Sequence, residues 1–114
     1  MPGRVAIFLS HADPGALRLA GSCALAAAAL GERVDLFAFG PAVPELAGAR
    51  GDPDHAAAAL FRAREAGTVR FLACSASVVE ERVDPALAEG AFDAVVGWPT
   101  VLEWTRGVPE RFFF

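Results

Sequence analysis

The stretch Arg4-Val-Ala-Ile-Phe-Leu9 and the pair Asp13-Pro14 that follows it decide the fold class. An unbroken apolar run of this length is typical of a parallel strand that is covered on both faces. Asp favours the N-cap of a helix and Pro favours its first position, so a helix is predicted to begin at Pro14. The helix continues to about Leu30, and Gly31 is the C′ residue that ends it.

The same alternation of strand and helix continues along the rest of the sequence. Asp52-Pro53 and Asp84-Pro85 repeat the helix start, and Ser77-Val-Val-Glu80 fits a capping box. The later predicted strands are Arg33–Phe39, Thr68–Ala73, Phe92–Val96 and Val108–Phe114, and the later predicted helices are 53–66, a short one opened by Ser77, 85–90 and 99–106. Because parallel strands need crossover helices, the pattern predicts one domain, 1–114, that is a three-layer α/β/α sandwich.

The composition excludes several kinds of chemistry and partner. The 114 residues carry a net charge of −4, and the ten basic residues are arginines scattered along the chain. We therefore expect no binding to nucleic acid or to an anionic membrane surface. Lys, Tyr, Asn and Gln are absent, which excludes Schiff-base lysines, the P-loop lysine, tyrosine acids and amide oxyanion holes.

The two cysteines and the start of the sequence predict a reducing compartment. The apolar run after Arg4 is too short and wrongly flanked for a secretory signal. The longest apolar stretch, Ala16–Leu30, is interrupted by Arg18, Gly21 and Ser22, and it falls short of the ~20 residues of a membrane span. We expect a cytoplasmic protein without a structural disulfide.

The first predicted helix suggests contact with a second subunit. Arg18 is its only charged residue between Ala16 and Leu30. A helix that is apolar on nearly every side is normally buried on nearly every side, so we expect a homo-oligomer. The alternative is that alanine serves here only as a good helix former.

The longest predicted connection runs from Gly40 to Asp52. Its residues Pro41, Pro44 and Gly48 predict a segment without regular structure. Loops of this length in compact domains often cover binding sites. We therefore expect this segment to be a lid beside the third strand.

The residues that follow the predicted strands are the candidates for function, because ligands of open parallel sheets gather at the carboxyl ends of the strands. They are Ser10, His11 and Asp13 after the first strand, Cys74, Ser75 and Ser77 after the third, and Gly97, Trp98 and Thr100 after the fourth. For Trp98 and Trp104, which stand at helical spacing, packing in the core or against a subunit is the simpler interpretation.

Cys74 is the main candidate for chemistry. It comes three residues before Ser77, the predicted N-cap. Unpaired N–H groups and the positive end of a helix dipole favour a thiolate, which is the nucleophilic form. The alternative is a small buried residue that ends the strand. Cys23 lies in the middle of the first helix with no charged neighbour, so it is expected in the core.

His11 is at the same rim and is the candidate base or thiolate partner. The alternative is a histidine in a solvated loop. His11 and Asp13 provide only two potential metal ligands, so no metal site is predicted. His55 is expected to be a surface residue.

Several segments together resemble the DsrE/DsrF-like family, the DsrE/TusD type of sulfur-relay protein. They are the first strand and its alanine-rich helix, Gly31, Val34-Asp-Leu-Phe-Ala-Phe39, Val69-Arg-Phe-Leu-Ala-Cys74-Ser-Ala-Ser77, Asp84–Gly90, and a last strand rich in Phe. The resemblance covers nearly the whole chain, and the strand that ends in Cys and small residues is its most specific part. It implies a five-stranded parallel sheet, an oligomer, and a sulfur-accepting role for Cys74.

The expected function is intracellular sulfur relay of a sulfurtransferase-like kind, with Cys74 as the persulfide carrier. Ser75, Ser77 and backbone N–H groups stabilise the thiolate in this hypothesis, and His11 supplies or takes a proton. The partners are a protein sulfur donor and a protein acceptor, and no cofactor is required. The alternative is a non-catalytic oligomeric subunit that binds a small ligand or a protein at the same rim.

Overall fold

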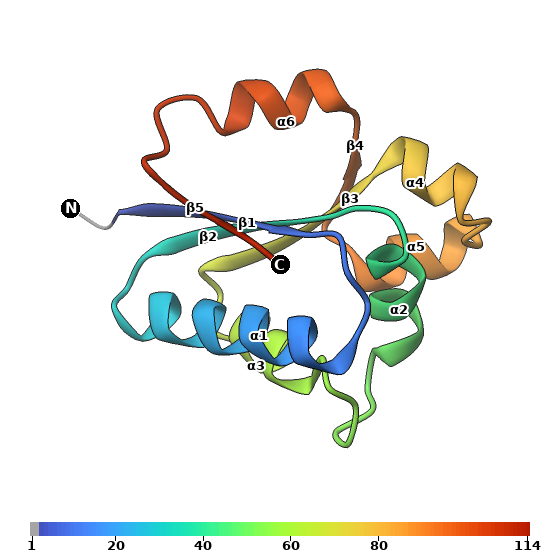
Figure 1. The fold of residues 1–114 in the computed structure, drawn as a ribbon, viewed down its shortest axis with the longest axis horizontal. Helices are drawn as coiled ribbons and strands as arrows, with labels where there is room; N and C mark the ends of the chain where they lie inside the picture. The colour runs from blue at the N-terminus through green and yellow to red at the C-terminus, as the bar shows by residue number, and fades with distance from the viewer. Residues whose placement is uncertain (1–2) are drawn as a thin grey trace.

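The sheet contains five parallel strands with helices on both faces, as the sequence predicts (Figure 1). A computed structural model describes residues 3–114, and residues 1–2 of the predicted domain lie outside the described residues. The strands are β1 (Arg4–Leu9), β2 (Arg33–Ala38), β3 (Val69–Cys74), β4 (Ala94–Val96) and β5 (Glu110–Phe113). The helices are α1 (Pro14–Ala29), α2 (Ala42–Ala49), α3 (Ala58–Glu65), α4 (Ser75–Glu80), α5 (Pro85–Ala91) and α6 (Trp98–Trp104).

The order of the strands across the sheet is β4-β3-β2-β1-β5. Val5 of β1 pairs with Val34 of β2 on one side and with Glu110 of β5 on the other. The chain therefore steps outward from β1 to β4 and then returns to add β5 at the opposite edge. All the strands end at the same side of the sheet, where α2, α4 and α5 stand (Figure 1).

The long helix α1 begins and ends where the sequence predicts. The Asp13 carboxylate accepts a hydrogen bond of 3.1 Å from the Ala16 N–H, and Pro14 is the first helical residue. Gly31 follows the helix with a φ of 77°, a left-handed conformation that glycine adopts without strain. Neither α1 nor another helix of residues 3–114 is long and apolar enough to cross a membrane.

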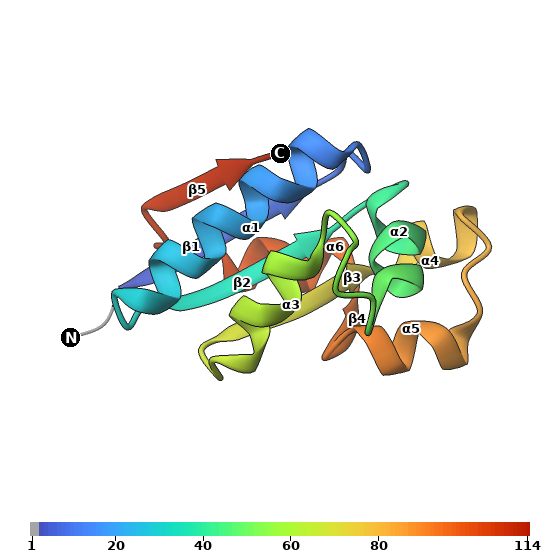
Figure 2. The same cartoon turned by 90° about the horizontal axis from the view of Figure 1, so that it is seen from below.

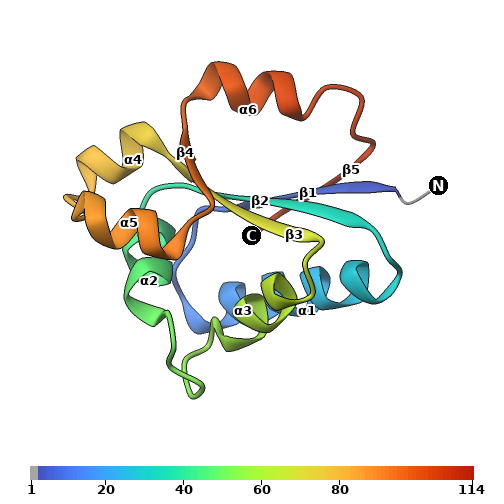
Figure 3. The same cartoon turned by 180° about the vertical axis from the view of Figure 1, so that it is seen from behind.

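Two apolar clusters of unequal size stabilise the sheet from its two faces. The larger joins α1, α2, α3 and α5 to one face, with α1 and α3 side by side (Figure 2). The smaller lies on the other face, which α6 covers alone (Figure 3). Gly21 lets α1 approach α3 closely, because a Cβ there would stand 2.8 Å from the Ala59 Cβ. Part of the apolar surface of α1 is thus covered within the chain, by α3.

The prediction of an irregular lid between Gly40 and Asp52 is wrong. Residues 42–49 form α2, whose Ala42, Val43 and Leu46 are fully buried. Pro44 is compatible with the helix because it lies in the first turn, where a backbone N–H needs no helical partner. This segment is part of the core and does not cover the rim as a loop.

Asp52-Pro53 does not start the next helix, contrary to the prediction. The Asp52 carboxylate accepts the Asp54 N–H at 3.0 Å, which makes a tight turn. The helix α3 begins later, where the Nδ1 of His55 accepts the Ala57 N–H at 3.0 Å. The Nε2 of His55 therefore carries the ring hydrogen and donates it to the Glu45 carboxylate at 2.8 Å. His55 is half-buried and links α2 to α3, so the expectation of a simple surface residue is also wrong.

Candidate functional site

Cys74 is the last residue of β3 and the N-cap of α4. Both cysteines of the chain are free thiols, and the Cys74 residue is only 5% exposed. Alternation along β3 places Cys74 on the same face as Leu72, which belongs to the smaller cluster under α6. Its partner across the sheet is Val96, the last residue of β4. The thiol therefore lies at the rim, on the face that α6 covers.

Two aromatic residues stand beside Cys74 on this face. Phe39 continues the ladder one step past Ala38, the partner of Ala73, and its N–H donates to the Leu9 carbonyl at 2.9 Å. Phe39 therefore comes level with Cys74 on the next strand. Trp98 follows β4 after Gly97 and stacks on Phe39 with ring centroids 4.8 Å apart. The stacked pair therefore lies at the same end of this face as the thiol.

Trp98 is 51% exposed, so it covers its neighbours and is not itself enclosed. Sequence reasoning assigned it to packing and did not single out Phe39. The sequence could have placed Phe39 on this face, because residues two apart along a strand, such as Phe37 and Phe39, point to the same face.

Ser77 has a different role from the predicted N-cap. The helix α4 begins at Ser75, so Ser77 is already its third residue. Its hydroxyl is buried and accepts the Gly40 N–H at 2.9 Å, which joins the end of β2 to α4. Ser75 is exposed, and its Oγ would stand 3.6 Å from a Cβ placed on Gly97. Of the two serines, Ser75 is therefore the one whose hydroxyl is open to a ligand at the rim.

His11 lies at the same rim but over a different strand. It is exposed, and its Nδ1 stands 3.3 Å from the Ser10 hydroxyl. Because β2 lies between β1 and β3, the ends of β1 and β3 are two strand spacings of ~4.8 Å apart. Within residues 3–114 no hydrogen bond joins His11 to Cys74. Its role as a proton donor or acceptor stays a prediction.

Cys23 packs against the larger cluster, as expected. Burial, and secondly the negative charge of Glu110, raise the pKa of the Cys23 thiol above its usual value. Cys23 is therefore mostly protonated at neutral pH and a poor nucleophile.

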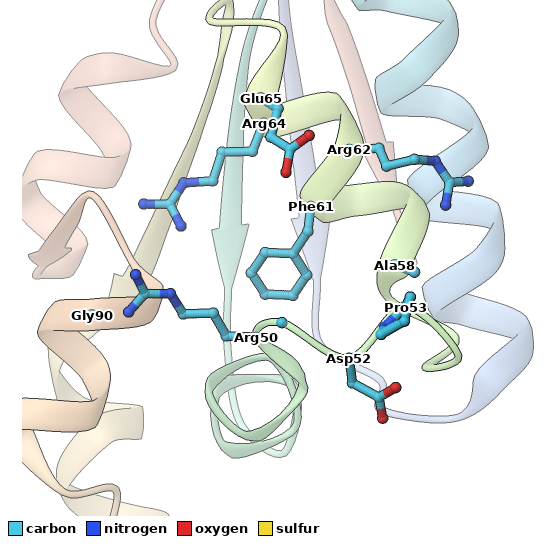
Figure 4. A pocket seen from close by; sticks show the side chains of 10 residues that line it. Arg50, Asp52, Pro53, Ala58, Phe61, Arg62, Arg64, Glu65 and Gly90 are labelled. Carbon is cyan, nitrogen blue, oxygen red and sulfur yellow. The ribbon is translucent and has the colours of Figure 1, made fainter.

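A cavity of about 640 Å³ lies away from Cys74, beside α3 and the segment that joins it to α2 (Figure 4). Arg50, Phe61, Arg64 and Gly90 are among its lining residues. Sequence reasoning placed Arg50 within the connection from Gly40 to Asp52 and singled out no binding residue there, so this cavity was missed. Across residues 3–114, no three His, Cys, Asp or Glu side chains come together in a way that could hold a metal ion.

No protein-family model and no curated protein matches the sequence. Two solved structures resemble the fold closely. The conserved protein of unknown function BT1422 from Bacteroides thetaiotaomicron is 12% identical, with a TM-score of 0.77 over 97% of this chain and 94% of that one. The ychN protein from E. coli is 18% identical, with a TM-score of 0.69 over 100% of both chains. At these identities the likeness concerns the fold alone, and the chain has the five-stranded parallel α/β fold of these two proteins.

Proposed function

We propose that this protein accepts a sulfane sulfur on Cys74 and passes it to another protein. The observation that carries the proposal is the place of Cys74, a free thiol between the end of β3 and the first N–H groups of α4. No side chain caps these N–H groups, so they are available to stabilise a thiolate or a persulfide anion. The resemblance of residues 69–77 to the sulfur-accepting segment of DsrE/DsrF-like proteins supports the same role.

The transfer needs no added oxidant or reductant. The Cys74 thiolate attacks the outer sulfur of a donor persulfide, and the bond between the donor's two sulfurs breaks. The donor leaves as a thiolate, and Cys74 becomes a persulfide. An acceptor thiolate then attacks the outer sulfur, and the Cys74 thiolate leaves. In this proposal the exposed hydroxyl of Ser75 donates a hydrogen bond to the outer sulfur.

The proposal is tested by treating the native protein with glutathione persulfide and measuring its intact mass. We expect wild type and Cys23→Ser to gain one sulfur atom that dithiothreitol removes, because Cys23 is a poor nucleophile. Cys74→Ser should gain none. A gain on Cys23, or no gain by folded wild-type protein, would contradict the proposal.

The burial of Cys74 favours a second candidate function. A thiol that is 5% exposed meets few reagents, and free cysteines are among the most buried residues of ordinary cores. In this second hypothesis the protein is a non-catalytic subunit that binds a small ligand or a protein at the rim. Folded wild-type protein that gains no sulfur in the experiment above would support it.

We also propose that the native protein is a homo-oligomer. Large apolar side chains remain exposed on the α6 side of the molecule, with Leu102 60% and Phe113 72% exposed. Leu19 on α1 is 61% exposed as well. Exposed apolar side chains that gather on one side of a domain mark an interaction site more often than scattered ones do. Sedimentation equilibrium at micromolar concentration should give a mass of at least two chains, and a single monomeric species would contradict the proposal.

A further inference from the structure

We propose that the cavity beside α3 binds a small organic monoanion with a flat aromatic body, independently of Cys74. Its volume of about 640 Å³ falls within the range of small-molecule sites. Its walls come from the segment after α2, from α3 and from the end of α5, so it lies at a junction of three elements (Figure 4). Arg50 is the group that receives the anion, and Phe61 receives the aromatic body.

Arg50 is the cation that we assign to the anionic group of the ligand. Its guanidinium lies against the end of α5, where a Cβ on Gly90 would stand 2.6 Å from the Arg50 Nη1. The absence of a side chain at Gly90 therefore leaves room for the guanidinium. Within the described chain, residues 3–114, Arg50 forms no ion pair with a carboxylate. A planar guanidinium with free N–H groups binds carboxylates in a bidentate manner.

Arg64 has a structural role instead. It donates to the Ala91 carbonyl and to the Asp93 carboxylate, each at 2.9 Å. These two hydrogen bonds hold its guanidinium on the wall of the cavity, and Asp93 neutralises its charge. Arg62 extends from the other side of α3, away from Arg50 (Figure 4). Of the two lining arginines that form no ion pair within residues 3–114, Arg50 is therefore the one that we assign to the ligand.

The charges on the cavity limit the ligand to a single negative group. Asp52 and Glu65 also line the cavity, and neither is paired with Arg50. Their carboxylates repel a second anionic group on the same ligand. This arrangement favours a monocarboxylate over a polyphosphate.

Phe61 is the residue that favours a flat aromatic body in the ligand. Its ring packs edge-to-face on Phe71, with centroids 5.3 Å apart and an interplanar angle of 63°. Phe71 is fully buried, so it fixes the orientation of the Phe61 ring. Phe61 itself is only partly buried, and its ring lies between Arg50 and Ala58 in the cavity (Figure 4). A flat apolar ring stacks favourably on such a surface.

The test is an isothermal titration of the full chain with 2-naphthoate and with its neutral match, 2-naphthamide. We expect 2-naphthoate to bind with a stoichiometry of one, and Arg50→Gln to weaken this binding about tenfold or more, because a charge-assisted hydrogen bond is lost. Arg50→Gln should leave the binding of 2-naphthamide unchanged.

Arg62→Gln is the matched control. It removes the same positive charge from the same cavity rim, but the Arg62 side chain extends away from Arg50 and from the proposed position of the anion. It should change the affinity for 2-naphthoate less than about twofold. Phe61→Leu should weaken the binding of both compounds. Equal affinity of wild type and Arg50→Gln for 2-naphthoate, an equal loss in Arg62→Gln, or no binding to the wild-type protein would overturn the proposal. None of these outcomes depends on sulfur transfer at Cys74.

Discussion

Replacing Trp98 with Ala is expected to speed the alkylation of Cys74 by iodoacetamide about tenfold or more, since access as well as thiolate character sets the rate. The indole of Trp98 stacks on Phe39, which stands level with Cys74 on the neighbouring strand. Without the indole, Phe39 loses its stacking partner and the end of this face is more open. Because Trp98 is half exposed, its loss costs the fold less buried area than the loss of an enclosed tryptophan would. The rate is measured by peptide mapping of native protein alkylated for increasing times.

Trp104→Ala is the matched control for this experiment. Trp104 belongs to the same helix, but its ring packs under Arg70, whose Cζ lies 4.7 Å from the ring centroid. Its removal should leave the alkylation of Cys74 unchanged. The labelling of Cys23 in the same samples reports general loosening of the fold and should stay constant in Trp98→Ala. An unchanged rate at Cys74 in folded Trp98→Ala would show that the aromatic pair does not control access.

Replacing Asp93 with Ala is expected to lower the free energy of unfolding by about 2 kcal/mol, because it leaves the buried N–H of Phe71 without a partner. One oxygen of the Asp93 carboxylate accepts this N–H at 2.7 Å, and the other accepts from Arg64 at 2.9 Å. These bonds attach the start of β4 to β3 and to α3. The Asp93 side chain is 38% exposed, which keeps the expected loss below the upper end of the usual range. Urea unfolding at pH 7 measures the difference.

The contribution of Asp93 should also depend on pH. Burial alone would raise the pKa of the Asp93 carboxyl, but the hydrogen bonds from Arg64 and Phe71 and the charges of Arg64 and Arg70 outweigh it and lower the pKa. A lowered pKa means that the folded state favours the carboxylate. The resulting stabilisation is complete above the ordinary value of 3.8 and is lost as the pH falls through the lower folded pKa.

Asp93→Asn separates the charge from the hydrogen bond, because its amide oxygen still accepts the Phe71 N–H. We expect it to be destabilised less than Asp93→Ala at pH 7, and its difference from wild type should shrink as the pH falls below 3.8. A difference from wild type that grows towards low pH would contradict this assignment.

The parallel fold could be predicted because its signals are local. The run Arg4–Leu9, the cap Asp13-Pro14 and the terminator Gly31 each act within a few residues, and the structure confirms all three. The prediction for the segment Gly40–Asp52 was wrong because its structure depends on contacts with distant residues. Proline and glycine there suggested a loop, but burial of Val43 and Leu46 against the rest of the core stabilises a helix. Tertiary contacts of this kind override local preference and are not visible in a single segment.

In the candidate site too, local signals could be predicted from the sequence and tertiary contacts could not. Cys74, Ser75 and Ser77 could be placed at the rim because the ends of parallel strands share one edge. The hydrogen bond from Gly40 to Ser77 and the stacking of Trp98 on Phe39 could not, since both depend on side-chain packing between residues far apart in the sequence. The cavity at Arg50 could not be predicted either, because its walls come from separate parts of the sequence, residues 50–65 and Gly90.

The position of β5 beside β1 has a consequence for how the chain is made and folded. Val5 pairs with Glu110, so one edge of β1 stays open until almost the whole domain has been synthesised. During that time the backbone groups of β1 and the ring of Phe8, which later stacks on Phe113, have no cover on that side. Contacts between residues this far apart form slowly. A nascent chain with an open strand edge is prone to pair with its neighbours on the same polysome, so the last four-residue strand protects the first one from aggregation.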